Sequence, residues 1–310
     1  MRALGIDTSN YTTSAAMYDS RTAEATQRRM LLPIPDGGKG LRQSDAVFHH
    51  IKRLPGLLEE LMQGMQPPDA VGVSVRPRDA KGSYMPCFLA GEMAARAIAS
   101  AMKIKIFSFS HQAGHIAAAL YGAGAMELAR EPFLAFHASG GATECLLVGP
   151  GREIPFEVEI LGETRDLSAG QVIDRVGVML GLRFPAGPQL EKLAVQSEKT
   201  IPVKPVLKDS DCCLSGLENQ CAALIESGEH PADVAGFCQN TVGGAILGMA
   251  KDAAKKHPGL PFVFAGGVMS NARIRELAAS QIEGAIFAPA HLSADNAVGV
   301  AVLCHMRSQR

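Results

Sequence analysis

Two histidines, His111 and His115, stand four positions apart in the segment Ser110–Ile116. On a helix this spacing puts both imidazoles on one face, where both can bind one metal ion. Asp295, in the later segment 293–297, adds a carboxylate. Two neutral nitrogens and one carboxylate suit Zn or Fe, and they leave coordination positions free for a substrate or water. The three residues therefore predict a metal that takes part in chemistry rather than a structural metal.

Other interpretations of the histidines are weaker. His49 and His50 are adjacent, so on a helix they point about 100° apart, and they are interpreted as structural or surface residues. Zinc proteases also space two histidines by four, but their signature needs a Glu directly after the first His. Here that position is Gln112, whose amide cannot accept a proton as a general base. The spacing alone therefore does not predict a protease.

Composition limits the class of protein. The chain has 310 residues, of which 47% are hydrophobic and 20% charged, as expected for a folded protein large enough for two lobes. We expect a cytoplasmic protein, since neither a signal peptide nor a membrane-spanning run is evident. Seven cysteines without a Cys-x-x-Cys pattern predict reduced, mostly buried thiols. The formal charge of -1 means that any RNA contact needs a local patch, such as Arg76, Arg78 and Lys81.

Alternating apolar patterns predict a duplicated α/β unit. Residues 3–6 and 14–18 read as strands joined by a polar turn, and 133–137 and 144–148 repeat this arrangement around the turn 138–143. Glycines and hydroxyls in such turns can approach an anion closely. Because the turns recur at equivalent places, we expect both to face phosphates.

Further elements are expected between and after these hairpins. The patterns predict strands at 70–75, 104–108 and 261–265, a helix at about 87–102, and a second helix that starts near Ala272. Gly266-Gly267 lies between the last strand and that helix, where backbone amides can bind an anion or a nucleotide.

The order of these motifs resembles the family of tRNA threonylcarbamoyladenosine transferases, long misannotated as O-sialoglycoprotein endopeptidases. The resemblance runs from Met1 almost to the C-terminus. The matching motifs are Gly5-Ile-Asp-Thr-Ser9, His111 with His115, Ser139-Gly-Gly141, Asp166-Leu-Ser-Ala-Gly-Gln-Val-Ile-Asp-Arg175, Phe184-Pro-Ala-Gly-Pro188, Leu214-Ser-Gly-Leu217, Gly266-Gly-Val-x-x-Asn271 and Asp295-Asn296. Such a resemblance implies a two-lobed fold akin to actin and sugar kinases. We expect residues 1–110 to form the first lobe, 111–290 the second, and 291–310 to pack back on the first.

The resemblance also implies the site. One divalent metal, Fe or Zn, would be held by His111, His115 and Asp295. In some relatives a Tyr near the metal precedes the Ser-Gly-Gly turn by two positions; here it is His137, either a third imidazole ligand or an ordinary strand residue. ATP or an acyl-adenylate would bind the residues that the family's motifs supply. These are Ser139, Gly140, Gly141, Gly170, Asp174 and Asn271, with Glu157, thirteen positions before Gly170, expected at the ribose.

Several positions depart from the family's pattern. The usual Cys-Asp-Asp/Glu-Thr is replaced by Asn10-Tyr-Thr-Thr13, and a Gly-Pro-Gly-Leu turn by the longer, basic segment 76–83. Ala142 follows the Ser-Gly-Gly turn where relatives often have His or Asn, and Glu218 stands in place of a Lys. The metal and nucleotide positions persist while those on the acceptor side differ, which is the pattern of a paralogue.

The resemblance implies transfer of threonylcarbamoyl from its adenylate to the N6 amine of a tRNA adenosine beside the anticodon. No covalent enzyme intermediate is expected, because no cysteine has a neighbourhood that demands one. The expected partners are tRNA, a smaller relative of the same fold and an accessory ATPase, with no membrane. Two alternatives stay open: a paralogous carbamoyl or acyl transferase with another, small-molecule acceptor, and a non-catalytic regulatory partner.

Overall fold

The computed structural model describes residues 1–34, 40–152 and 155–309, and it is built around two five-stranded sheets. In the first sheet the strand order is β3-β2-β1-β4-β5, with β1 antiparallel to β2 and parallel to β4. Its strands are β1 (Arg2–Ser9), β2 (Thr12–Asp19), β3 (Glu24–Leu31), β4 (Ala70–Arg76) and β5 (Lys105–Ser110).

The second sheet repeats the first in order and direction. Its order, read from the equivalent edge, is β8-β7-β6-β11-β12, with β6 antiparallel to β7 and parallel to β11. Its strands are β6 (Phe133–Ala138), β7 (Thr143–Pro150), β8 (Phe156–Glu163), β11 (Phe262–Ala265) and β12 (Ile286–Phe287). The predicted duplicated α/β unit is therefore confirmed.

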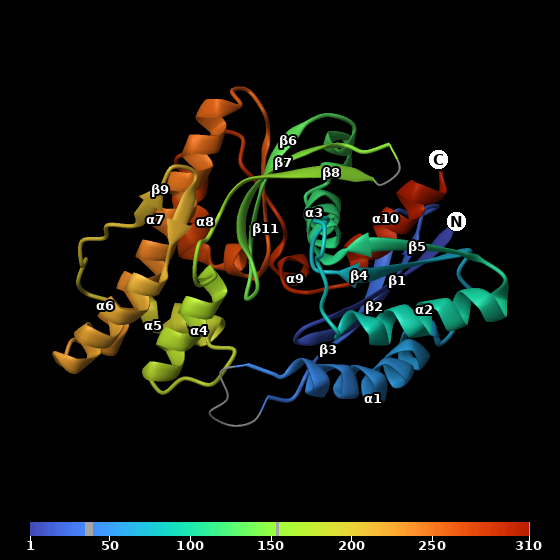
Figure 1. Cartoon of the computed structure of the whole chain (residues 1–310), viewed down its shortest axis with the longest axis horizontal. Helices are drawn as coiled ribbons and strands as arrows, with labels where there is room; N and C mark the ends of the chain where they lie inside the picture. Colours follow the sequence, from blue (N-terminus) through green and yellow to red (C-terminus); the bar gives the residue numbers. More distant parts are fainter. Residues whose placement is uncertain (35–39, 153–154, 310) are drawn as a thin grey trace.

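Helices cover the first sheet on both faces. Figure 1 shows α1 (Gln43–Met62) and α2 (Phe88–Met102) side by side along one face. On the other face α10 (Val298–Ser308) packs against β1 and β4, so the C-terminal helix belongs spatially to the first sheet. Gly5 permits this packing, because a Cβ there would lie 2.5 Å from the carbonyl oxygen of Ala297.

Helix α3 (His111–Gly122) lies between the two sheets. It contacts α10, β11 and β6, and its residues Ile116 to Leu120 are fully buried. The helices α3 and α10 approach so closely that a Cβ on Gly299 would lie 1.8 Å from the carbonyl oxygen of Gly114. The beginning of α3 is thereby fixed at the junction of the two lobes.

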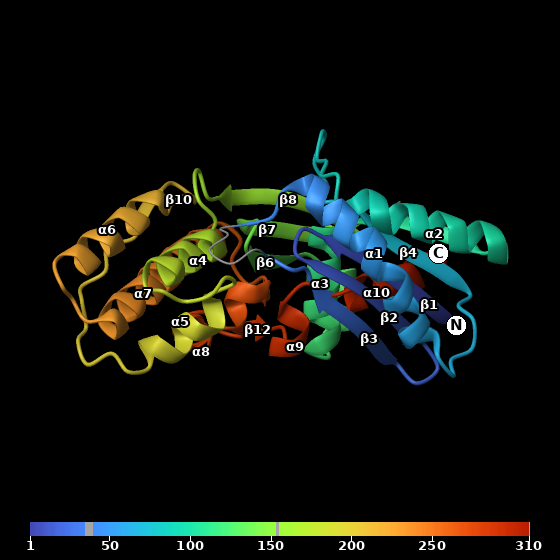
Figure 2. The same cartoon turned by 90° about the horizontal axis from the view of Figure 1, so that it is seen from below.

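The second lobe carries most of the remaining helices. Figure 2 shows them as the half of the molecule remote from α1 and α2. Helix α7 (Pro231–Lys256) packs on β6 and β7 and forms the second lobe's core. The others are α4 (Ala169–Met179), α5 (Gly187–Ala194), α6 (Ser215–Glu226), α8 (Ala272–Ala279) and α9 (Ala290–Ser293), with 3-10 turns at Met126–Arg130 and Gly267–Ser270 and a small hairpin of β9 (Val206–Lys208) and β10 (Asp211–Cys213).

The predicted strands and helices occur with shifted ends. The first hairpin is tighter than predicted: its strands extend to Ser9 and restart at Thr12, leaving only Asn10 and Tyr11 in the turn. All seven cysteines are free and six are buried, as predicted. No helix of the described part of the chain is long and apolar enough to cross a membrane.

Candidate metal and nucleotide site

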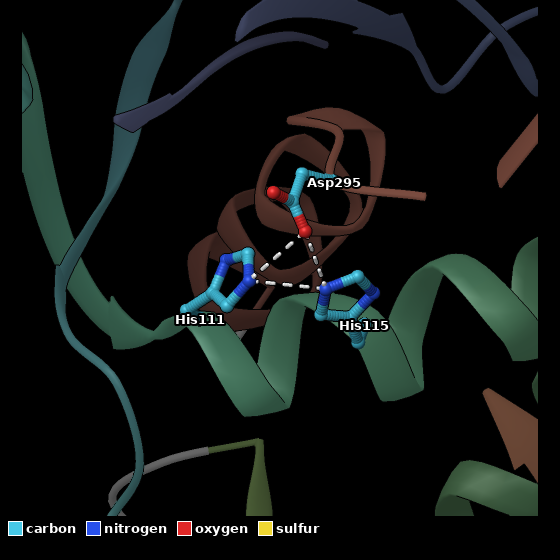
Figure 3. A group of neighbouring side chains, drawn as sticks. All are labelled: His111, His115 and Asp295. Carbon is cyan, nitrogen blue, oxygen red and sulfur yellow. Dashed lines mark hydrogen bonds and ion pairs between the residues drawn. The ribbon is translucent and has the colours of Figure 1, made fainter. Parts of the chain in front are cut away.

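The first turn of α3 presents the two predicted histidines together. The hydroxyl of Ser110 caps the helix by accepting a hydrogen bond from the backbone N–H of Ala113, at 3.1 Å. His111 and His115 then lie one turn apart, with their Nε2 atoms 3.0 Å apart. Figure 3 shows both rings facing Asp295, which comes from the loop between α9 and α10.

The spacing of the three side chains fits one metal ion. The Oδ1 atom of Asp295 lies 3.5 Å from Nε2 of His111 and 3.3 Å from Nε2 of His115. A tetrahedral ion with bonds of about 2.0–2.1 Å holds its ligand atoms about 3.3–3.4 Å apart. The three atoms therefore lie near the corners that such an ion requires, and further coordination positions remain for a substrate.

A second carboxylate orients the first histidine. Asp7, at the end of β1, is fully buried and places Oδ2 2.8 Å from Nδ1 of His111. Its other oxygen accepts a hydrogen bond from the backbone N–H of Ser9, and Ser74 donates its hydroxyl to Oδ2. With Nδ1–H donated to Asp7, the Nε2 lone pair of His111 is directed at the ion.

Electrostatics couple these groups. Burial opposes the charged form of His111, but the negative charges of Asp7 and Asp295 raise its pKa to about 10. Burial and the neighbouring His111 lower the pKa of His115. Burial also opposes ionisation of Asp295, yet its hydrogen bonds to the two histidines hold its pKa well below the usual range. The two carboxylates thus favour positive charge at this place, as a site for a metal cation requires.

His137 stands beside this cluster. Its ring centre lies 4.7 Å from that of His115. The side chain is 3% exposed, and within the described residues neither ring nitrogen has a hydrogen-bond partner. Among described residues the group of mutually close ligand atoms consists of His111, His115 and Asp295, without His137. Both of its ring nitrogens are therefore buried beside His115 without a hydrogen-bond partner among the described residues.

A cavity of about 500 Å³ opens over the group formed by His111, His115 and Asp295. Both lobes line it: the first hairpin and the segment after β4 on one side, the Ser-Gly-Gly turn and β7 on the other. Its lining residues include Tyr11, Arg78, His111, His137, Gly140, Glu144 and Asp295.

The Ser139-Gly140-Gly141 turn lines this cavity, and Gly140 also lines a second, smaller cavity. The hydroxyl oxygen of Ser139 accepts hydrogen bonds from the backbone N–H groups of Gly141 and Ala142. The N–H of Ser139 donates to the carbonyl of Ala142, whereas the structure's described part gives the N–H of Gly140 no partner. Gly170 packs against this turn, because a Cβ there would lie 2.6 Å from the carbonyl oxygen of Ser139. Gly140 and the Ser139 hydroxyl are thus the donors left for an anion.

The second cavity, of about 270 Å³, lies between α4, the start of α5 and the turn before α8. It is lined by Gly140, Gly170, Asp174 and Asn271, which are four of the residues predicted to bind a nucleotide. Asn271 also caps α8 by accepting the backbone N–H of Ile274. The predicted turn and helix N-terminus therefore meet at one cavity.

The expectation for Glu157 is wrong. This residue is exposed on β8, opposite Gly149, and lines neither cavity. An acid thirteen positions before a glycine also occurs as Asp174 and Gly187, and both line the second cavity. Gly187 lines this cavity although the sequence analysis did not predict it as a site residue.

The basic segment is largely neutralised. Arg76 pairs with Asp79 at 2.6 Å, and Arg78 pairs with Glu144 and Glu163. Lys81 alone of the three predicted cations has no ion pair within the described residues. Arg76 and Arg78 are therefore held in ion pairs, and Lys81 is exposed and unpaired within the described residues.

Comparison with known sequences identifies close counterparts of the whole chain. A family model described as tRNA N6-adenosine threonylcarbamoyltransferase matches residues 35–302. A protein of that name from Thermus thermophilus is 31% identical over 318 residues, covering 100% of this chain and 94% of the relative. One from Streptococcus agalactiae is 31% identical over 270 residues, covering 82% and 76%.

Comparison with solved structures supports the actin-like, sugar-kinase-like fold. HypF from T. kodakarensis matches with a TM-score of 0.66 at 13% identity, over 98% of this chain and 46% of HypF. Component A of (R)-2-hydroxyglutaryl-CoA dehydratase from Acidaminococcus fermentans matches with a TM-score of 0.60 at 14% identity, over 100% of both chains. At these identities the likeness concerns the fold alone.

Proposed function

The chain belongs to the tRNA N6-adenosine threonylcarbamoyltransferase family, and we propose that it performs the reaction in that name on a tRNA adenosine beside the anticodon. It is an acyltransferase: the acyl group is threonylcarbamoyl, the donor is its adenylate, and the acceptor is the N6 amine. The bond that forms joins N6 to the carbamoyl carbon, the bond between that carbon and the phosphate oxygen breaks, and AMP and the N6 proton leave.

The observation that carries this proposal is the junction of the two cavities. Gly140 lines both of them, and the consecutive residues Ala294 and Asp295 line one each. An adenylate has a nucleotide end and an acyl end joined by one phosphate. With the nucleotide in the smaller cavity, its phosphate would lie at Gly140 and its acyl group over the metal cluster.

The smaller cavity supplies the nucleotide contacts. We assign the ribose to Asp174, whose carboxylate can accept hydrogen bonds from hydroxyl groups. Asp174 Oδ1 also accepts the backbone N–H of Ala186, which holds it at the start of α5. Gly187 and Asn271 complete this end of the cavity.

The metal belongs to the acyl end. His111, His115 and Asp295 would hold one divalent Fe or Zn ion, which when bound supplies a Lewis acid for phosphate or carbonyl oxygens. Asp7 keeps His111 in the tautomer that binds the ion. We further propose that His137 contacts the acyl group or the ion, since both of its buried nitrogens need a partner.

The protein groups would act mainly by positioning. An exocyclic amine of adenine is a poor nucleophile, so holding it against the acyl carbon should account for much of the acceleration. The N–H of Gly140 and the hydroxyl of Ser139 can stabilise negative charge that develops on the phosphate as it leaves. The seven thiols, of which six are buried, have no assigned role in this scheme.

Partners are part of the proposal. We expect a smaller relative of the same fold and an accessory ATPase to assist, and a tRNA substrate would place the protein in the cytoplasm. Exposed apolar side chains on adjacent helices, Phe48 and Ile51 of α1 with Leu89 and Met93 of α2, are suited to a protein partner.

The test is incubation of the metal-loaded protein with unmodified tRNA and threonylcarbamoyl-adenylate, with and without those partners, followed by mass analysis of the tRNA nucleosides. We expect threonylcarbamoyladenosine to appear. Its absence, with metal and nucleotide bound, would point to another acceptor. His111→Ala should lose the metal and the product while keeping the fold, and His49→Ala is the matched control.

A further inference from the structure

The segment between β4 and α2 reaches from the first lobe to the second. Its start is fixed to α3, because the carbonyl of Pro77 accepts the backbone N–H of Gln112 at 2.9 Å. Asp79 holds Arg76 and accepts the hydroxyl of Ser110, the capping residue of α3. This segment is therefore placed by the same helix that carries the metal ligands.

Arg78 extends from this segment to the far wall of the larger cavity. Its Nη1 donates to Oε1 of Glu144 at 2.8 Å and to Oε2 of Glu163 at 2.9 Å, both in the second lobe. The structure's described residues provide no acceptor for its Nε and Nη2. These two nitrogens form one edge of the guanidinium, the edge that binds a carboxylate through two parallel hydrogen bonds.

The two glutamates occupy only Nη1 of Arg78, so its Nε and Nη2 are the part of the guanidinium that a further anion could bind. Glu144 has a side chain only 5% exposed, and Gln112 also donates to it, so its oxygens are committed within the wall. Glu163 is 46% exposed, so water screens its charge. Among the residues that line the cavity, Arg78 is the one Lys or Arg. A negative group that enters the cavity therefore has one protein cation to bind.

We propose that Arg78 is a substrate-binding residue that holds the carboxylate of the acyl group. The inference rests on the proposed function, because a threonylcarbamoyl group carries the carboxylate of threonine at the end remote from the adenylate. With the carbonyl over the metal cluster and the carboxylate on Arg78, both ends of the acyl group are fixed. Ser83 and Tyr84 also line this cavity, and the hydroxyl oxygen of Ser83 accepts the backbone N–H of Arg78 at 3.1 Å.

The experiment compares two non-hydrolysable sulfamate analogues of the adenylate by titration calorimetry with the metal-loaded protein. One carries threonylcarbamoyl, and the other carries the threoninol group, in which CH2OH replaces the carboxylate. Two charge-assisted hydrogen bonds should favour the carboxylate analogue by roughly 10- to 100-fold in Kd. Arg78→Ala should reduce that ratio to near one, and Arg78→Lys should leave a ratio of a few-fold.

The control is Glu163→Gln, which removes one negative charge beside Arg78 but keeps the guanidinium, and it should leave the ratio unchanged or raise it. A purely structural ion pair between lobes would instead weaken both analogues equally in Arg78→Ala. Equal weakening of both analogues in Arg78→Ala would overturn the assignment. So would a Kd ratio near one in the unmodified protein, or a failure of that protein to bind either analogue. The tRNA assay runs in parallel. If threonylcarbamoyladenosine forms but the two analogues bind equally, only the assignment of Arg78 is overturned. If the analogues bind with different Kd but no threonylcarbamoyladenosine forms, only the tRNA acceptor is overturned.

Discussion

The Nδ1 atom of His111 lies 2.8 Å from the carboxylate of Asp7, a residue 104 positions earlier in the chain. One belongs to the helix between the lobes and the other to the central strand of the first sheet. His111 is thus connected to the first hairpin through a partly buried hydrogen bond, and its orientation depends on the packing of α3 against the first sheet.

Asp7→Asn should weaken metal binding by roughly 10- to 100-fold, because the amide removes the charge that supports the His111 tautomer. Metal affinity can be measured by competition with a chromophoric chelator. Asp69→Asn, an exposed residue whose carboxylate accepts the backbone N–H of Arg2, is the control and should leave the affinity unchanged. Equal affinities in the two variants would contradict the orienting role.

Asp174→Asn should stabilise the protein near neutral pH while it weakens nucleotide binding. Burial raises the pKa of Asp174 to about 6, although hydrogen bonds from Ala186 and Gly187 oppose the shift. The ionised carboxylate therefore destabilises the fold: the cost is absent below about pH 3.8 and grows as pH rises to about 6. Urea unfolding should give Asp174→Asn about 1 to 3 kcal/mol more stability at pH 7.5. Near pH 4 the two proteins should be equal.

Gly170→Ala should displace the Ser-Gly-Gly turn. Its Cβ would meet the backbone of Ser139 and Gly140 at 2.6 and 2.7 Å, so the turn must shift, at about 1 to 3 kcal/mol of stability. We expect adenylate affinity to fall at least tenfold. Gly216→Ala, in an exposed part of α6 with open space around it, should be neutral or slightly stabilising. Calorimetry with the adenylate analogue and thermal melts on both variants provide the comparison.

The native protein should react quickly with a thiol reagent at one cysteine only. Cys213 is the one thiol of the seven that is not buried. Burial raises the pKa of Cys87, Cys145 and Cys304 to about 12, so these thiols stay protonated and unreactive at neutral pH. Ellman's reagent should give one rapid equivalent when native and seven when unfolded. If the protein still transfers threonylcarbamoyl after Cys213 has been modified, the result agrees with a reaction that needs no thiol.

Much of the fold follows from patterns that are local in the chain. The alternation of strands and turns predicted two equivalent hairpins, and both sheets have that arrangement. His111 and His115 were predictable as a pair, since their geometry depends only on helical spacing. Asp295 was grouped with them by its residue type and by the resemblance, because the packing of α10 against α3 that brings it there is a long-range property.

Other site residues depend on packing that no local pattern records. Asp7 was predicted to lie in the turn after the first strand, and its hydrogen bond to His111 exists only because β1 and α3 come together in the fold. Arg78 reads as a surface cation, whereas its partners Glu144 and Glu163 come from the other lobe. The prediction for Glu157 was wrong for a different reason. The residue stands thirteen positions before Gly170, as expected, but on β8 it is exposed and lines neither cavity.

The close packing of α10 against α3 has a consequence for when the metal-binding residues can come together during synthesis of the protein. A chain is made from its N-terminus, and Asp295 is the last of the metal-site residues to be synthesised. Until α10 docks, with Gly299 against Gly114, the two histidines face no carboxylate from that loop. Tight metal binding is therefore expected only after the segment that carries Asp295 has been made and α10 has packed against α3.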